Sequence, residues 1–125
     1  MRTVFMAYLT GSVEAVDFYC KAFNATPKNC FKASDDDDFY AHAEIAIGDQ
    51  TILGISEKAH YDMAFTKGNN MEFWLTFDSE DALNAAYGVL KENAKIHQPL
   101  APCEWSKAVA GVTDKYGIRW LLNVF

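Results

Sequence analysis

Two side chains that could transfer a proton stand two positions apart in one predicted strand. Residues 39–47 alternate, with one side formed by Ala41, Ala43, Ile45 and Ile47 and the other by His42, Glu44 and Ala46. Because successive side chains of a strand point to opposite faces, His42 and Glu44 should share a face. An imidazole or a carboxylate beside a bound molecule can act as a general base, so His42 and Glu44 are the candidate catalytic residues. A histidine on such a face is also commonly a hydrogen-bonded surface residue.

A second set of polar and aromatic side chains recurs at strand spacing in the C-terminal half. Glu72, Trp74 and Thr76 alternate with Phe73, Leu75 and Phe77. Arg119 and Asn123 fall on the equivalent face of the last predicted strand. Aromatic rings beside charged groups suit a small organic ligand. A solvated sheet face that carries Arg119–glutamate ion pairs is the alternative.

Apolar spacing and turn residues indicate the elements that must position these side chains. The predicted strands are 3–10, 28–34, 39–47, 51–56, 72–77, near 95–100, 107–113 and 118–124. A helix over about 12–24 has Ser12 as its N-cap and ends at Asn24, and a second helix begins after Asp78 or Ser79. The side chains expected to pack beneath the helices are Ala43, Ile45, Ile47, Phe73, Leu75, Phe77, Ile118, Trp120 and Leu122.

The same order of elements occurs twice along the chain. Residues 3–56 and 71–124 each predict a strand, a helix and three further strands, and the polar segment 57–70 links them. Repeated units of this kind usually share a continuous surface, because one unit cannot bury its apolar face alone. We therefore predict one α+β domain over residues 1–125, built from two β-α-β-β-β pseudo-repeats.

Three local motifs stand in the positions that a known superfamily would give them. They are EAVDFYCKAF at 14–23, HAEIAIGD at 42–49 and DKYGIRW at 114–120. In this order the chain resembles the glyoxalase/bleomycin-resistance/dioxygenase (vicinal-oxygen-chelate) superfamily, and its PhnB-like branch in particular. The resemblance implies tandem modules that form a curved mixed sheet with a concave cleft. Glu104-Trp105-Ser106 departs from the Phe-Trp-Gly that this branch usually has.

The resemblance also implies where a ligand would bind. It places the polar strand faces inside the cleft, and Trp105 and Lys107 near its mouth. The candidate ligand-binding residues are then Tyr8, Glu72, Trp74, Thr76, Trp105, Lys107 and Arg119. Trp105 could equally close a dimer seam or cap the core, and the same choice applies to Tyr8.

Many members of this superfamily hold a divalent metal with four donors from the first, fourth, fifth and eighth strands. The corresponding positions here are Phe5 or Met6, Gly54 or Ile55, Glu72, and Leu121. Only Glu72 offers the oxygen or nitrogen donor that such ions need, so we predict no metal and no other cofactor. A displaced site formed by His42, Glu44 and Glu72 is the alternative.

Charge and cysteine usage limit the partners and the cell compartment. The formal charge is −6, and the 11 lysines and arginines are scattered, so we expect neither nucleic-acid nor membrane binding. The three cysteines are widely spaced and odd in number, which favours a reducing, cytoplasmic location over a disulfide framework.

Together these patterns predict a protein that binds an unknown small molecule, with or without catalysis. The alternatives are a metal-dependent lyase, isomerase or dioxygenase, and a non-catalytic dimer that sequesters a compound as resistance proteins do. A methyltransferase is disfavoured, because no glycine-rich strand-to-helix turn is present. Open sheet edges make a homodimer the expected assembly.

Overall fold

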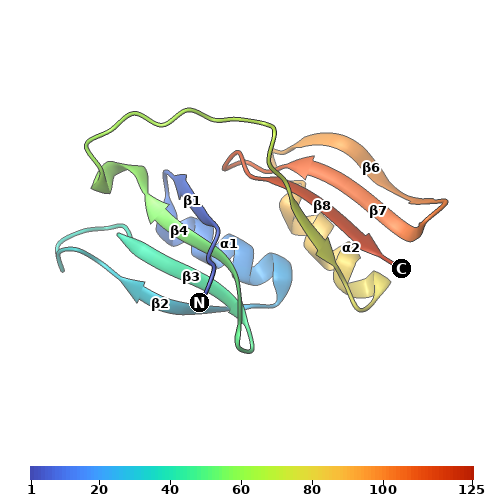
Figure 1. Cartoon of the computed structure of the whole chain (residues 1–125), viewed down its shortest axis with the longest axis horizontal. Coiled ribbons are helices and arrows are strands. Elements are labelled where there is room, and N and C mark those ends of the chain that lie inside the picture. The colour runs from blue at the N-terminus through green and yellow to red at the C-terminus, as the bar shows by residue number, and fades with distance from the viewer. The chain divides into compact units, whose positions relative to one another are not determined.

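The computed structural model describes all residues from Met1 to Phe125. The chain forms two compact units, Met1–Thr66 and Lys67–Phe125. Each unit contains a helix and a four-stranded mixed sheet, in the order β-α-β-β-β (Figure 1). The predicted α+β class and the repeat of elements are therefore confirmed.

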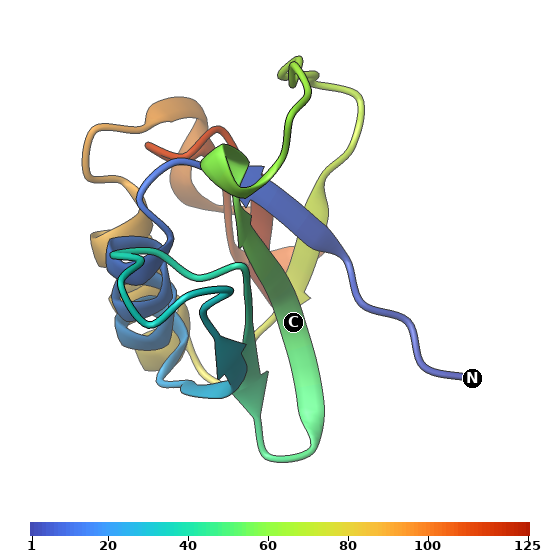
Figure 2. The ribbon, with the colours of Figure 1, turned by 90° about the vertical axis from the view of Figure 1, so that its left-hand side faces the viewer.

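In unit 1 the first strand lies next to the last. Its elements are β1 (Met6–Leu9), α1 (Ser12–Phe23), β2 (Thr26–Phe31), β3 (His42–Ile47), β4 (Gln50–Glu57) and a short 3-10 helix, η1 (Lys58–His60). The strand order is β1-β4-β3-β2, with β1 parallel to β4 and the other pairs antiparallel. Figure 2 shows α1 lying along one face of this sheet.

Unit 2 repeats this topology. Its elements are β5 (Phe73–Thr76), α2 (Glu80–Leu90), β6 (Lys95–Cys103), β7 (Ser106–Thr113) and β8 (Arg119–Val124). The strand order is β5-β8-β7-β6, with β5 parallel to β8. Pro99 and Pro102 lie in β6, where an edge position tolerates residues that cannot donate to a ladder.

The start of α1 differs from the prediction. Gly11 precedes the helix with φ of 88°, and its N–H donates to both carboxylate oxygens of Glu57, at 3.1 and 2.9 Å. A negative charge at this end also suits the helix dipole. Ser12 is the first helical residue, and its hydroxyl accepts instead from the Tyr40 N–H at 2.8 Å. The other predicted ends hold, since Asn24 is left-handed and the Ser79 hydroxyl caps α2.

Strand alternation sorts the core of unit 1 as predicted, with one exception. Ala43 and Ile45 of β3 are fully buried on the face that α1 covers. Ile47 was expected to join them but is 49% exposed. The register of β3 against β4 shifts between Ile45 and Ala46, and this irregularity breaks the alternation just before the hairpin turn.

The core of unit 2 centres on Trp120. Trp120 and Leu122 are fully buried, as predicted, whereas Phe73, Leu75, Phe77 and Ile118 are only half-buried. The Trp120 indole N–H donates to Asp114 Oδ2 at 2.8 Å, and Asp114 Oδ1 accepts from the backbone N–H groups of Tyr116 and Ile118. Asp114 therefore ties the turn before β8 to the core.

Neither helix is long and apolar enough to cross a membrane.

We expect Asp114→Ala to destabilise the protein by about 2–4 kcal/mol, because it leaves a buried indole N–H and two backbone donors without their acceptor. Urea unfolding measures the change. Asp35→Ala, in the exposed acidic turn, is the matched control and should unfold within about 0.5 kcal/mol of the parent chain. Equal midpoints for the two variants would contradict this role for Asp114.

Candidate functional site

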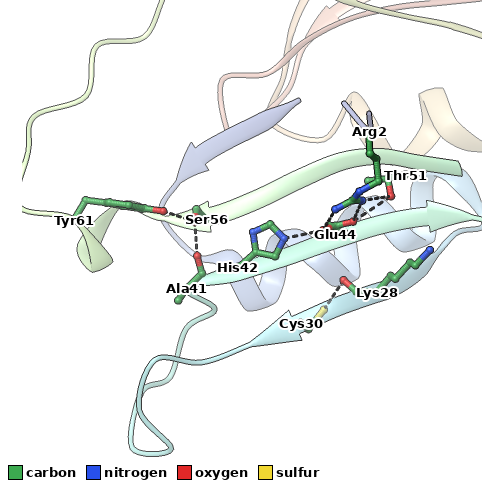
Figure 3. Close-up of polar contacts among 9 residues, drawn as sticks. All are labelled: Arg2, Lys28, Cys30, Ala41, His42, Glu44, Thr51, Ser56 and Tyr61. Atoms are coloured by element: carbon green, nitrogen blue, oxygen red, sulfur yellow. Dashed lines mark hydrogen bonds and ion pairs between the residues drawn. The ribbon is translucent and has the colours of Figure 1, made fainter. Parts of the chain in front are cut away.

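The two candidate catalytic residues lie together on the face of the unit 1 sheet that is turned away from α1. We call this surface helix-free face 1. His42 and Glu44 reach it from β3, because they alternate with the buried Ala43 and Ile45. The His42 Nε2 atom lies 2.8 Å from Glu44 Oε2 (Figure 3). The spacing in the sequence thus translates into direct contact.

Glu44 is a buried carboxylate with three side-chain partners. Arg2 donates through Nη1 to Oε1 at 2.8 Å and through Nη2 to Oε2 at 3.3 Å. The Thr51 hydroxyl donates to Oε1 at 3.1 Å, and His42 Nε2 lies within hydrogen-bond distance of Oε2. The hydrogen bond from Arg2 is the largest of the effects that lower the pKa of Glu44 to about 2, against the opposing effect of burial. Glu44 is therefore ionised at neutral pH.

This geometry gives the two residues different chemical roles. A carboxylate with a pKa of about 2 holds protons weakly, so Glu44 is a poor base at neutral pH. It is a good acceptor, however, and assigns the proton of neutral His42 to Nε2. The free lone pair is then on Nδ1, which makes His42 the better candidate for a base. The Phe31 ring lies nearly parallel to the imidazole, with centroids 5.8 Å apart.

Tyr8 belongs to an aromatic cluster at the end of β1. Its ring stacks on Phe65 with centroids 5.0 Å apart and meets Tyr61 edge-on at 5.3 Å. The Tyr61 hydroxyl is 3.0 Å from Ser56 Oγ, and Ser56 in turn donates to the Ala41 carbonyl (Figure 3). These contacts anchor the chain that follows β4. Tyr8 remains partly exposed.

In unit 2 the side-chain amide of Asn123 forms hydrogen bonds with two side chains of β5. On the sheet face turned away from α2, which we call helix-free face 2, Asn123 Oδ1 accepts from Trp74 Nε1 at 2.6 Å and from Thr76 Oγ1 at 2.9 Å. The parallel pairing of β5 with β8 sets Thr76 opposite Asn123. Asn123 is fully buried, and its Nδ2 atom has no hydrogen-bond partner.

Trp105 extends this site into an aromatic surface. Its ring centroid lies 5.5 Å from that of Trp74 and 6.4 Å from that of Phe125. Trp74 and Trp105 are 56% and 47% exposed. Both tryptophans are among the predicted ligand-binding residues, whereas Phe125 is not.

Two charged candidates of unit 2, Arg119 and Glu72, form an ion pair. Arg119 Nε donates to Glu72 Oε2 at 3.0 Å, and Arg119 Nη1 donates to the Asn69 carbonyl at 3.0 Å. This is the arginine–glutamate pair that the solvated-face alternative describes. Lys107 is exposed on β7. The roles of all these residues in binding stay predictions.

The residues at the expected metal positions do not fit a metal ion. Gly54 is covered by the thioether of Met6, which any side chain at Gly54 would strike. Leu121 offers no donor atom, and the carboxylate of Glu72 is engaged by Arg119. Nor do three His, Cys, Asp or Glu side chains come together elsewhere in an arrangement that could hold a metal ion.

Comparisons with known proteins place the chain in one superfamily. A sequence model described as Glyoxalase/Bleomycin resistance protein/Dioxygenase superfamily matches residues 8–122. A search of the curated proteins finds no significant match.

Solved structures show the same fold at low sequence identity. The PhnB protein from Bacillus cereus is 20% identical with a TM-score of 0.82, and 100% of each chain is covered. Protein PA1353 from Pseudomonas aeruginosa is 21% identical with a TM-score of 0.80, covering 99% of this chain and 97% of that one. The fosfomycin resistance protein FosX from Mesorhizobium loti is 12% identical with a TM-score of 0.68, covering 98% and 90%.

Acid should destabilise the chain through Glu44. Its pKa is about 2 in the folded chain against an ordinary value of 4.5, so its stabilising effect is complete above about pH 4.5 and is lost as the pH falls towards 2. We expect Glu44→Gln to be less stable than the parent chain at pH 7, by about 1–3 kcal/mol, and the difference to shrink with acidification. Urea midpoints between pH 7 and pH 2.5 measure both effects.

The control for this prediction is Glu92→Gln, which removes a carboxylate that lies 3.8 Å from Lys115 and is mostly exposed. Its pH dependence should match that of the parent chain. If Glu44→Gln also follows the parent curve in parallel, Glu44 is not the group that titrates.

Proposed function

This chain belongs to the Glyoxalase/Bleomycin resistance protein/Dioxygenase superfamily, and we propose that it binds a small organic molecule on the helix-free faces of its sheets without a divalent metal ion. Membership supports a small-molecule role in general terms. The binding surface and the kind of ligand are inferred from the side chains of this chain.

One observation carries the proposal: Trp74 and Trp105 lie close together, with their rings tilted by 46°, and are about half exposed beside the buried amide of Asn123. Exposed tryptophan pairs are costly in water and are typical of binding surfaces. The unpartnered Nδ2 atom costs about 1–3 kcal/mol, a deficit that a ligand acceptor could remove. Because Trp74 is more than half exposed and bonds the same amide, it is the side chain that would move to admit such a group.

The ligand that suits this surface has a flat apolar body and a hydrogen-bond acceptor. Its body would lie against the tryptophans and its acceptor would reach Asn123 Nδ2. Binding alone would let such a site sequester the ligand, and no catalytic step is required.

A second candidate function is metal-free proton transfer by His42. The hydrogen bond between His42 and Glu44 supports it, because an ionised carboxylate orients the imidazole. A metal-dependent lyase, isomerase or dioxygenase is less well supported, since Glu72 alone among the expected positions carries a donor atom. We also propose a cytoplasmic location, because the three free cysteines would stay reduced there.

A panel of planar aromatic amides and ketones tests the binding proposal. Compounds that bind should shift the indole N–H resonances of Trp74 and Trp105 in NMR spectra and leave that of buried Trp120 in place. Trp74→Ala should weaken binding at least about tenfold, the loss expected for an aromatic anchor. Met63→Ala, which removes an exposed apolar side chain of unit 1, should bind as the parent does. A panel without any such shift, or equal affinities for Trp74→Ala and the parent, would refute the proposal.

We further propose that the chain forms a homodimer. Each sheet leaves two edge strands, β1 and β2 in unit 1 and β5 and β6 in unit 2, and such edges favour pairing with another chain. Light scattering at high protein concentration should give twice the 14.0 kDa mass of the chain. A monomer mass under those conditions would reject the dimer.

A further inference from the structure

The buried carboxylate of Glu44 depends on a counter-charge that is itself exposed. The Glu44 side chain is 1% exposed, whereas that of its partner Arg2 is 60% exposed. A buried charge is normally compensated by groups of the surrounding core. Here the only cation with an ion pair to Glu44, apart from a protonated His42, comes from the first residues of the chain.

The segment that carries Arg2 precedes the first strand of unit 1. Residues 1–5 belong to no strand, and residues 1–3 are exposed. The backbone of this segment is tied to the sheet where the Gly54 N–H donates to the Phe5 carbonyl at 2.8 Å. Figure 2 shows the segment, in blue, leaving the sheet on the side away from α1. The guanidinium is thus held mainly by its own contacts and by a short tether.

The acceptors that receive Arg2 are arranged for a planar cation. Nη1 and Nη2 engage the two carboxylate oxygens in a fork, and Nη1 also lies 3.4 Å from Thr51 Oγ1 (Figure 3). Guanidinium and amidinium groups match this two-oxygen geometry, whereas an ammonium is a compact point charge that does not span it.

We propose that Glu44, Thr51 and His42 form a binding site for the guanidinium or amidinium group of a small molecule, and that Arg2 occupies this site as a tethered substitute. A ligand of this class would displace Arg2 and inherit its hydrogen bonds. Because Glu44 is already ionised, the site offers a ready carboxylate acceptor to such a ligand.

The tether determines how strongly Arg2 competes. A group on a short flexible segment acts as if present at a millimolar concentration. A free guanidinium compound must exceed that value to displace it, so the parent chain should bind such compounds weakly. Removing the Arg2 side chain should reveal the intrinsic affinity of the site.

This site does not depend on ligand binding at Trp74 and Trp105. Its residues belong to unit 1, and those tryptophans belong to unit 2. Failure of the aromatic panel would therefore leave the present inference intact, and the reverse also holds.

The experiment compares methylguanidinium with methylammonium as probes at constant ionic strength and pH 7. Binding is followed by the backbone amide resonances of Glu44 and Thr51 in the full chain. We expect Arg2→Met to bind methylguanidinium at least about tenfold more tightly than the parent, and methylammonium more weakly than methylguanidinium. The double variant Arg2→Met with Glu44→Gln should show no saturable change.

Two further variants keep the test decisive. Arg2→Lys retains a charged tether and should bind methylguanidinium with intermediate affinity, which covers the case that Arg2→Met fails to fold. Lys95→Met removes an exposed lysine of unit 2 and should behave as the parent. The inference is overturned if folded Arg2→Met or Arg2→Lys binds no better than the parent, if the two probes bind equally, or if binding persists without Glu44.

Discussion

Each four-stranded sheet of this chain has a single helix, which covers one of its two faces. The covered faces carry small and aliphatic residues such as Ala43 and Ile45, or the large ring of Trp120. The opposite faces must then satisfy whatever polar groups the strands place there. The candidate functional residues are side chains on these opposite faces.

The two helix-free faces satisfy their polar groups in different ways. In unit 1 the network around Glu44 is complete, because Arg2, Thr51 and His42 use both carboxylate oxygens. In unit 2 the amide of Asn123 is satisfied on its oxygen and left open on its nitrogen. A complete network suggests a site that is already occupied, and an incomplete one suggests a site that awaits a partner. The two units thus present different chemistry on the same topology.

Local patterns predicted the elements well wherever periodicity alone decides them. The alternation of β3 and the burial of Trp120 followed directly from strand spacing. The errors arose where contacts distant in sequence intervene. Ile47 is exposed because β3 shifts register against β4, and Ser12 is not the cap because the carboxylate of Glu57 binds Gly11. Neither a register shift nor a cap from 46 residues away leaves a local signal.

By itself the sequence determined the α+β class, the repeat of strand, helix and three strands, and the shared face of His42 and Glu44, because these follow from spacings of two to four residues. Tertiary structure alone decided which groups meet across that face. Arg2 reaches Glu44 over 42 positions, and Trp74 reaches Asn123 over 49. Such pairs form only when strand pairing brings separate segments together, and for that reason Arg2 emerged as a functional residue only in the folded chain.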